Sequence, residues 1–252
     1  MKNVIFMGGK EVGYHCFLFL LEKAQELNLE VVALFENSSK LNRQEYDLVA
    51  VAEQHNIPVF SEMAKLIEQQ EVDFIFSIQY HLILTQAMIT KAKILAVNLH
   101  MAPVPEYRGC NQFSFAIIDE ANEFGTTLHR LEAKIDAGDV IAERRFRIPK
   151  ECFSSELHRL TVDHSIALFK SELKNIVSGH YTLIAQSELA KVRRVGFHSR
   201  NEIQNIRVID DNWTVEKKKR YFRATWFPPF EPPALNVNNK LIPLSLAWYH
   251  SL

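Results

Sequence analysis

The sequence has 252 residues, of which 47% are hydrophobic and 11% aromatic, and its formal net charge at pH 7 is −1. This length suits one large α/β domain, or one domain with a small appendage, and the composition excludes an intrinsically disordered chain. A near-neutral charge provides no overall field that would attract nucleic acid.

The first hundred residues alternate apolar runs with helical patterns. Successive strand–helix units predict a parallel, doubly wound sheet of the α/β class. The strands are apolar almost throughout, as burial on both faces requires. We expect strands at 3–9, 30–37, 57–61, 72–78 and 94–100, and helices at 11–27, 43–56 and 62–70.

A different pattern follows Gly125. Segments 126–133 and 139–148 are strand-like and predict a hairpin-like pair at one side of the sheet, and a helix is expected at 154–178. From about residue 191 prolines and aromatic residues accumulate. We therefore expect a main domain over 1–190 and a small C-terminal subdomain over 191–252.

The basic run at 216–220 fits a solvated helix face better than a nucleic-acid site. Three cysteines without metal-ligand spacing indicate reduced thiols. No apolar run has the length of a signal peptide or a membrane span. The expectation is a soluble cytoplasmic protein with neither nucleic acid nor membrane as a partner.

Three loops follow parallel strands and should therefore meet at the carboxyl edge of the sheet. Ligands bind at that edge in α/β proteins. Residues 8–13 could accept a phosphate at a helix N-terminus, although Lys10 stands where the dinucleotide motif has glycine. An ordinary tight turn explains this loop equally well. The loop at 77–84 could form a groove for a flat ring, but burial in the core is the simpler interpretation.

The segment after the fifth strand carries the clearest chemical pattern. Asn98 and His100 are two residues apart on a strand, so their side chains point the same way. Histidine transfers protons near neutral pH, and asparagine can stabilise an oxyanion. An aspartate from 135–139 could orient the imidazole. Such a group suits attack by an external amine on an acyl donor, while a polar strand end beside a turn aspartate is the alternative.

The ordered motifs N98-L-H100, P105-E-Y-R-G109, G125-T-T-L-H and D136-A-G-D139 resemble the 10-formyltetrahydrofolate-dependent formyltransferases. This resemblance implies a Rossmann-like fold. It also implies that Asn98, His100 and Asp136 are catalytic, with the histidine as general base, the asparagine stabilising the oxyanion and the aspartate supporting the histidine. One departure is Thr85, where the family often has proline.

Within the family, "YRGCNQFSFAI" and "RATWFPPFEPP" are most similar to the nucleotide-sugar N-formyltransferases. The resemblance implies formyl transfer to the 4-amino or 3-amino group of a dTDP-linked dideoxyhexose, with 10-formyltetrahydrofolate as donor and no metal. A homodimer and a role in lipopolysaccharide O-antigen biosynthesis are expected by analogy.

The resemblance also suggests two sets of binding residues. Folate would contact Tyr80, His81, Leu82, Ile83, Leu84 and Ile135. The nucleotide sugar would contact Gly9, Lys10, Tyr107, Arg108, Gly109, Cys110, Asn111, Gln112, Arg223, Trp226, Phe227 and Phe230. For each of the late aromatic residues, closing the core or forming a dimer contact is the competing interpretation.

Other functions stay open at this point. Glycinamide ribonucleotide and methionyl-tRNA formyltransferases would share the catalytic trio. An NAD-linked oxidoreductase would use the loop at 8–13 with Glu36 as a ribose partner. A non-catalytic protein would bind folate or a nucleotide sugar without transferring the formyl group.

Overall fold

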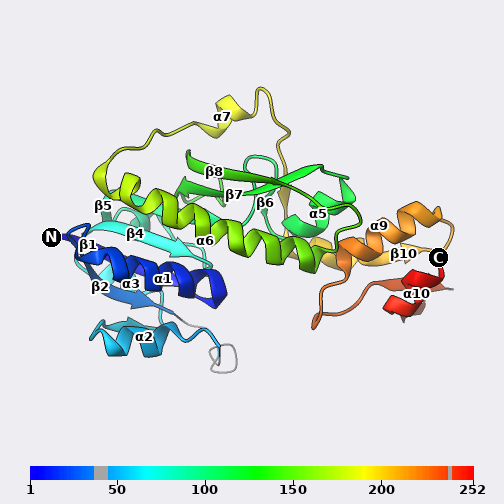
Figure 1. Cartoon of the computed structure of the whole chain (residues 1–252), viewed down its shortest axis with the longest axis horizontal. Coiled ribbons are helices and arrows are strands. Elements are labelled where there is room, and N and C mark those ends of the chain that lie inside the picture. The colour runs from blue at the N-terminus through cyan, green and yellow to red at the C-terminus, as the bar shows by residue number, and fades with distance from the viewer. Residues whose placement is uncertain (37–44, 238–239) are drawn as a thin grey trace.

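A computed structural model gives the structure of the chain and describes residues 1–36, 45–237 and 240–252. The main sheet is built from β1 Lys2–Gly8, β2 Leu29–Phe35, β3 Val59–Phe60, β4 Val72–Ile78, β5 Ala92–His100, β7 Glu123–Arg130 and β8 Val140–Arg147. Within the described residues these strands have the order β3-β2-β1-β4-β5-β7-β8 (Figure 1). β1 to β5 are parallel, whereas β7 is antiparallel to β5 and β8 is antiparallel to β7. The mostly parallel α/β sheet and the hairpin-like pair are thereby confirmed.

Helices cover both faces of this sheet, because its central strands are apolar on both sides. In β1, Val4 and Phe6 pack into one hydrophobic cluster, whereas Ile5 and Met7 pack into another. The alternation follows from the two-residue period of a strand. The first cluster lies under α1 Lys10–Ala24, α2 Leu48–Gln54 and α6 Ser154–Ser178, and the second under α3 Lys65–Glu68 and α4 Gln86–Ile89.

The expected helix at 154–178 is confirmed as α6, which ends before Gly179 in the left-handed conformation that commonly terminates helices. The other three expected helices are shorter than expected, and α1 ends at Ala24 instead of at residue 27. α2 begins only after Asp47, whose side chain caps it by accepting from the amide of Ala50 at 3.0 Å. α3 is a single turn instead of a helix over 62–70. Residues 37, 43 and 44 of the expected elements lie outside the described residues.

The C-terminal part forms a hydrophobic cluster of its own around Ile209, Phe222, Leu244 and Tyr249. Its elements are η2 Arg200–Glu202, α8 Ile203–Ile206, β10 Val208–Asp210, α9 Val215–Thr225, β11 Ala234–Val237, β12 Lys240–Pro243 and α10 Leu246–Ser251. The expected extended pieces include residues 238–239, which lie outside the described residues. A domain boundary at residue 191 stays a prediction.

The basic run at 216–220 lies in α9, where several of its charges have partners. Lys217 sits 4.0 Å above the ring of Trp213, and Lys218 pairs with Asp211 at 2.7 Å. The run thus lies on a helix, as expected, but its basic side chains are half-buried and partly paired, so the face is not fully solvated. No helix of the described residues is long and apolar enough to cross a membrane.

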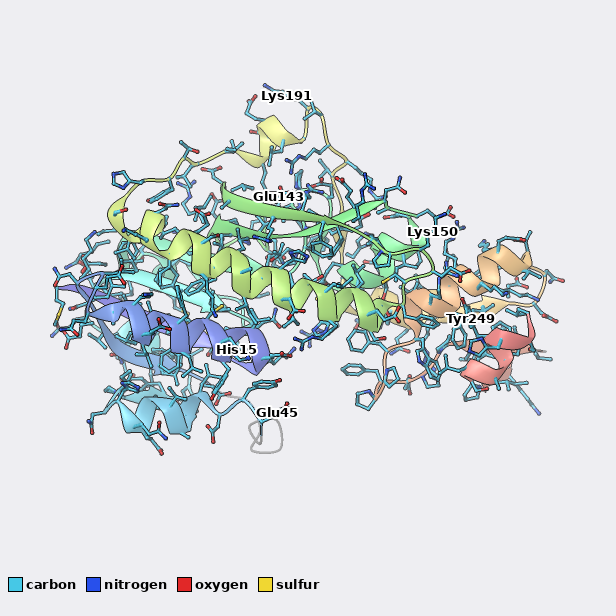
Figure 2. All side chains as sticks on the ribbon, in the orientation of Figure 1. His15, Glu45, Glu143, Lys150, Lys191 and Tyr249 are labelled. Carbon is cyan, nitrogen blue, oxygen red and sulfur yellow. The ribbon has the colours of Figure 1, made fainter. Side chains whose placement is uncertain are left out.

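A belt, which we define as residues 180–199, returns from the end of α6 across the sheet edge (Figure 1). It contains α7 Gln186–Leu189 and β9 Phe197–His198, and β9 pairs with β6 Arg108–Gly109. Figure 2 shows Lys191 on the belt, beyond β8 and its residue Glu143. The belt therefore connects the main sheet to the loop that follows β5.

Candidate active site

The site lies at the carboxyl end of β5, where the parallel part of the sheet meets the antiparallel hairpin. Asn98 and His100 stand two residues apart on β5, and the register places Asn98 opposite His129 and His100 opposite Thr127 on β7. The loop between β7 and β8 brings Asp136 to the same place. The three predicted catalytic residues are thus brought together, and His129 joins them.

His100 is oriented through both ring nitrogens. Its Nε2 lies 2.8 Å from the carbonyl oxygen of Tyr107, which can only accept, so Nε2 carries a hydrogen and donates. Its Nδ1 lies 3.5 Å from Oδ2 of Asp136. A neutral ring therefore has its lone pair on Nδ1, and a proton taken up there would lie beside a carboxylate. His100 is buried, with 8% exposure.

His129 is a site residue that the sequence interpretation missed. Its Nδ1 donates to the carbonyl of Arg130 at 2.9 Å, which leaves Nε2 of the neutral ring to accept from Nδ2 of Asn98 at 3.1 Å. The same Nε2 is 3.5 Å from Oδ1 of Asp136. His129 therefore fixes which way the Asn98 amide points. The alternating pattern at 126–133 predicts that His129 lies on a strand. It does not give the register of that strand against β5, which is what places His129 opposite Asn98.

Asp136 stands at the centre of the group in the left-handed conformation, with φ 47°. The amide of Gly109 donates to its Oδ2 at 2.9 Å. Burial by itself would raise the pKa of Asp136, but the charge that His100 carries when protonated, the hydrogen bond and charge of protonated His129, and the Gly109 amide outweigh burial and hold the pKa well below its ordinary value. The carboxylate is consequently charged at neutral pH.

The loop after β5 contributes mainly backbone groups to this centre. The side chain of Tyr107 is buried, and burial followed by the charge of Asp119 raises its pKa to about 12. The amide of Cys110 and the side chains of Arg108 and Asn111 bond to the belt or to Arg200 just beyond it, and Gln112 opens α5 Gln112–Ile118. Of the predicted sugar contacts here, Tyr107 and Gly109 thus act on the catalytic residues through their backbone.

The predicted folate residues divide into buried and exposed groups. Leu84 is only 4% exposed and Tyr80 packs against the same core cluster, while His81, Leu82, Ile83 and Ile135 are exposed. Burial, followed by the charge of Glu36, raises the pKa of Tyr80 to about 12. Of the exposed apolar side chains, Leu82 and Ile83 lie on the loop after β4 and Ile135 lies on the Asp136 loop, and a flat ring could cover them.

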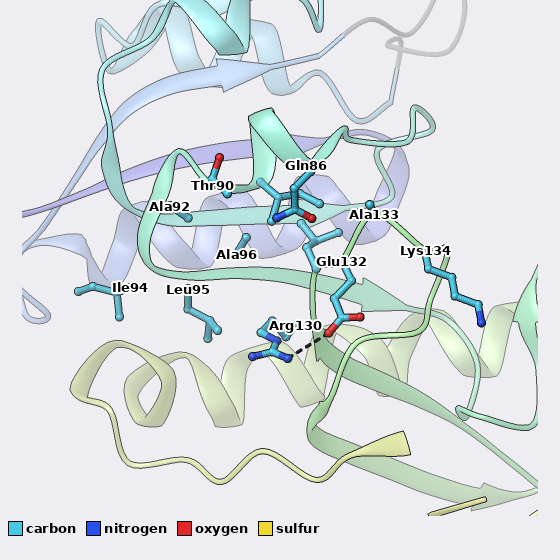
Figure 3. Close-up of a pocket in the computed structure, with 12 residues that line it drawn as sticks. Gln86, Thr90, Ala92, Ile94, Leu95, Ala96, Arg130, Glu132, Ala133 and Lys134 are labelled. Carbon is cyan, nitrogen blue, oxygen red and sulfur yellow. Dashed lines mark hydrogen bonds and ion pairs between the residues drawn. The ribbon is translucent and has the colours of Figure 1, made fainter. Parts of the chain in front are cut away.

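A pocket of about 510 Å³ lies between α4, β5 and residues 130–134, which lead into the Asp136 loop (Figure 3). Apolar side chains of β5, α4 and the loop after β7 line it, and Arg130 pairs with Glu132 at its rim at 3.0 Å. The lining includes Ile89, Leu95, Ala96, Leu131 and Ala133. None of these residues was singled out from the sequence, because each is an ordinary core type.

Lys10 and part of the aromatic–proline segment meet around His158. Lys10 opens α1 directly after Gly9, and burial, followed by the charge of Lys10, holds the pKa of His158 below its ordinary value. The His158 ring meets Phe113 and Phe227 nearly edge-on, at centroid distances of 5.3 and 5.4 Å. Phe230 lies 5.8 Å from Phe227, so it borders the same surface.

Trp226 packs against the C-terminal cluster, and Arg223 contacts one member of that cluster. The Trp226 ring stacks on Phe222 with centroids 5.2 Å apart, and Arg223 donates to the hydroxyl of Tyr249 at 3.4 Å. Closing the core, the alternative interpretation, accounts for these contacts. Glu36, the ribose partner in the oxidoreductase alternative, is only 1% exposed, which leaves its carboxylate little access to a bound dinucleotide.

Comparisons with known proteins extend these observations. Residues 2–171 match the family described as formyl transferase. The chain is 26% identical over 169 residues to GDP-perosamine N-formyltransferase from Brucella melitensis, covering 67% of this chain and 62% of that protein. It is 28% identical over 201 residues to methionyl-tRNA formyltransferase from Staphylococcus epidermidis, covering 75% and 63%. The matches thus span less than two thirds of these relatives.

Solved structures share the fold over almost the whole chain. The N-formyltransferase from Helicobacter canadensis, solved with folinic acid and dTDP-3-aminofucose, has a TM-score of 0.76 at 20% identity and covers 96% of this chain and 86% of that one. A sugar N-formyltransferase from Shewanella has the same TM-score at 14% identity, covering 97% and 96%. With the family match extending over more than half of the residues and the Asn98, His100 and Asp136 motif within it, the chain belongs to the formyl transferase family.

Proposed function

We propose that this protein transfers the formyl group of 10-formyltetrahydrofolate to the amine of a nucleotide-linked amino-dideoxy sugar. The observation that carries the proposal is the grouping of Asn98, His100 and Asp136 at the end of β5, where His100 contacts Asp136 directly and Asn98 is joined to Asp136 through His129. Family membership supports formyl transfer, and the similarity to a GDP-perosamine N-formyltransferase supports a nucleotide sugar as acceptor. A dTDP-linked 4-amino or 3-amino sugar is the specific acceptor we propose.

The chemistry begins with attack of the neutral sugar amine on the formyl carbon. A carbon–nitrogen bond forms, and the formyl oxygen gains negative charge in the tetrahedral intermediate. Asn98 has two N–H groups on Nδ2, of which one is directed at His129, so the other is free to donate to this oxygen. Removing such a donor typically lowers the rate by about 10²–10³-fold.

His100 serves as the general base in this proposal, through Nδ1. Its Nε2 hydrogen is held by the Tyr107 carbonyl, so Nδ1 takes the proton of the attacking amine. The new cation is stabilised by Asp136, which faces it as a carboxylate. The proton then passes to N10 of the folate as the carbon–N10 bond breaks, giving tetrahydrofolate and the sugar formamide.

Substrate binding uses the surfaces on either side of this group. The exposed apolar residues Leu82, Ile83 and Ile135 would contact the pterin. Lys10 would meet the diphosphate, while Phe227 and Phe230 would border the base. Holding the donor and the amine together makes the attack effectively unimolecular. A homodimer, a cytoplasmic location and a product used in O-antigen synthesis belong to the same proposal as predictions.

Methionyl-tRNA is the second candidate acceptor, because one relative of that activity is 28% identical over 201 residues. Two features favour the sugar. The Shewanella sugar N-formyltransferase matches this fold over nearly all of both chains, including the C-terminal part. In addition, basic side chains of α9 are engaged by acidic or aromatic neighbours, which leaves a weak surface for tRNA.

The test is a panel of dTDP-, UDP- and GDP-linked amino sugars, with glycinamide ribonucleotide and methionyl-tRNA included, each incubated with 10-formyltetrahydrofolate and read by mass spectrometry. We expect formylation of a dTDP-amino sugar by the wild type and by the surface variant His180→Asn, and loss of nearly all turnover in His100→Asn. Turnover of glycinamide ribonucleotide or methionyl-tRNA alone would refute the sugar acceptor. Wild-type turnover by His100→Asn at neutral pH would refute the general base.

A further inference from the structure

The belt contacts the backbone of the catalytic aspartate through one buried side chain. Nε2 of Gln186 donates to the carbonyl of Asp136 and to the carbonyl of Gly138, both at 2.8 Å. Gln186 is 7% exposed and comes 50 residues after Asp136 in the sequence. Neither contact reaches the Asp136 carboxylate, so Gln186 acts on the loop and not on the reacting atoms.

The direction of the Gln186 amide is determined by its partners. Both carbonyls only accept hydrogen bonds, so the NH₂ group and not the oxygen must face them. Oε1 is buried and has no hydrogen-bond partner among the described residues. The two bonds to the loop are therefore the hydrogen bonds of this side chain, and each uses one of the two N–H groups.

These bonds hold the loop in a conformation that Asp136 does not readily adopt alone. Its φ of 47° is left-handed, and a Cβ added at Gly138 would lie 1.8 Å from the carbonyl oxygen of Arg130. This path turns the carbonyls of residues 136 and 138 toward one donor while the carboxylate faces His100 and His129. One loop thus makes both sets of contacts: its carboxylate faces the two histidines, and its backbone carbonyls bond to Gln186.

Contacts with β8 on both sides of Gln186 hold the belt against the sheet, so Gln186 can restrain the Asp136 loop. Ile184 exchanges two backbone hydrogen bonds with Val140 at the edge of β8, both 2.9 Å. Further along, Arg193 pairs with Glu143 on β8 at 2.6 Å. Gln186 lies between these anchors and is therefore fixed relative to the sheet.

The same belt also restrains the second loop of the site. The amide of Gly196 donates to the carbonyl of Pro105 at 2.9 Å, and the amide of Cys110 donates to the carbonyl of His198 at 2.8 Å. Between them lie the Tyr107 carbonyl that orients His100 and the Gly109 amide that bonds to Asp136. One segment thus fixes the two loops that flank the catalytic group.

We infer that Gln186 is a positioning residue for formyl transfer, which sets the Asp136 carboxylate against His100 by holding the backbone of residues 136–138. The inference rests on the proposed function, since it takes Asp136 as catalytic. A displacement of catalytic groups by about 1 Å costs on the order of 10²-fold in rate. Binding of the amino sugar and folate should change little, because Gln186 touches neither.

The experiment compares wild type with Gln186→Met, which keeps the side-chain volume but removes both donors, and with Ser187→Ala, an exposed neighbour on α7. For Gln186→Met we expect kcat to fall about 10- to 100-fold and KM for the amino sugar formylated by the wild type to stay within about threefold. Amide hydrogen exchange of the unliganded protein should accelerate in residues 132–140 alone. Ser187→Ala should match wild type in all three measurements.

Unchanged kcat with unchanged exchange at 132–140 would overturn the inference. A fall in kcat accompanied by faster exchange throughout the sheet and a lower unfolding temperature would also overturn it, since Gln186 would then be only structural. If wild type formylates no amino sugar, the proposed function fails, whereas the exchange comparison still decides whether Gln186 holds the loop.

Discussion

Asp136 combines an uncommon backbone conformation with a central place in the candidate site. It is held in the left-handed conformation, and its carboxylate lies between two histidines and a backbone amide. The left-handed region costs most residues about 1–2 kcal/mol, and aspartate is among the residues that tolerate it better. A hydrogen bond to a charged group contributes about 1.5–3 kcal/mol, so the bond from the Gly109 amide to the carboxylate offsets this cost.

The depressed pKa of Asp136 makes a prediction about stability. Because its folded pKa is below the unfolded value, the charged carboxylate stabilises the fold above the unfolded pKa of about 3.9, and this contribution disappears as the pH falls toward the folded pKa. Wild type should therefore be more stable than Asp136→Asn in urea unfolding at pH 6, and the difference should shrink at pH 3. A difference that stays constant or grows on acidification would contradict the assignment.

At the scale of elements, the site depends on close approach of the belt to the loop after β5. Gly196 donates to the carbonyl of Pro105, and a Cβ at Gly196 would lie 2.1 Å from the carbonyl oxygen of Glu106. Backbone oxygen cannot move aside as a flexible side chain can, so an alanine there must separate the belt from the loop. β9 begins at the residue after Gly196, so this separation would also disturb the pairing of β9 with β6.

We expect Gly196→Ala to lower the free energy of unfolding by about 1–3 kcal/mol and to reduce kcat as well, because the displaced loop carries the Tyr107 carbonyl and the Gly109 amide. Gly179→Ala is the matched control. Gly179 has a positive φ, of 77°, and an added Cβ there would meet nothing within 4 Å. The control should lose about 1 kcal/mol from conformation alone and keep wild-type kcat. Equal kcat in both variants would argue against this coupling.

Over the whole molecule, two surfaces that are far apart in the sequence converge on the proposed nucleotide site. Lys10 comes from the first strand-to-helix loop, whereas Phe227 and Phe230 come from the segment after α9. His158 on α6 contacts Phe227 and is affected by the charge of Lys10, which places these groups on one side of the fold. The C-terminal part would thus close the nucleotide site as well as pack its own cluster.

Phe230 tests this arrangement because it is 71% exposed, and its loss should not affect folding. Stacking of a base on an aromatic side chain contributes about 1–3 kcal/mol, so Phe230→Ala should raise the dissociation constant of the nucleotide sugar about fivefold or more at unchanged unfolding temperature. Val192→Ala, at an 85% exposed belt position, is the control and should bind normally. Unchanged affinity in Phe230→Ala, measured by calorimetry, would remove this residue from the site.

The sequence by itself determined the order of strands and helices in the main sheet and the direction of side chains within one strand. Apolar strands alternating with helices predicted the sheet, and the two-residue period of a strand put Asn98 and His100 on the same side of β5. Asp136 followed from the ordered family motifs, not from geometry. Each of these inferences needs only neighbouring residues or a fixed spacing, because backbone periodicity fixes the direction of a side chain within its own element.

Only the tertiary structure decided which distant groups meet. The register of β7 against β5 brought His129 to Asn98, and the return of the belt brought Gln186 to the Asp136 loop from 50 residues away. The same folding put Trp226 into the C-terminal cluster, whereas Phe227, its neighbour in the chain, contacts His158. Strand register and loop path depend on the packing of the whole chain, so no local pattern of residues specifies them.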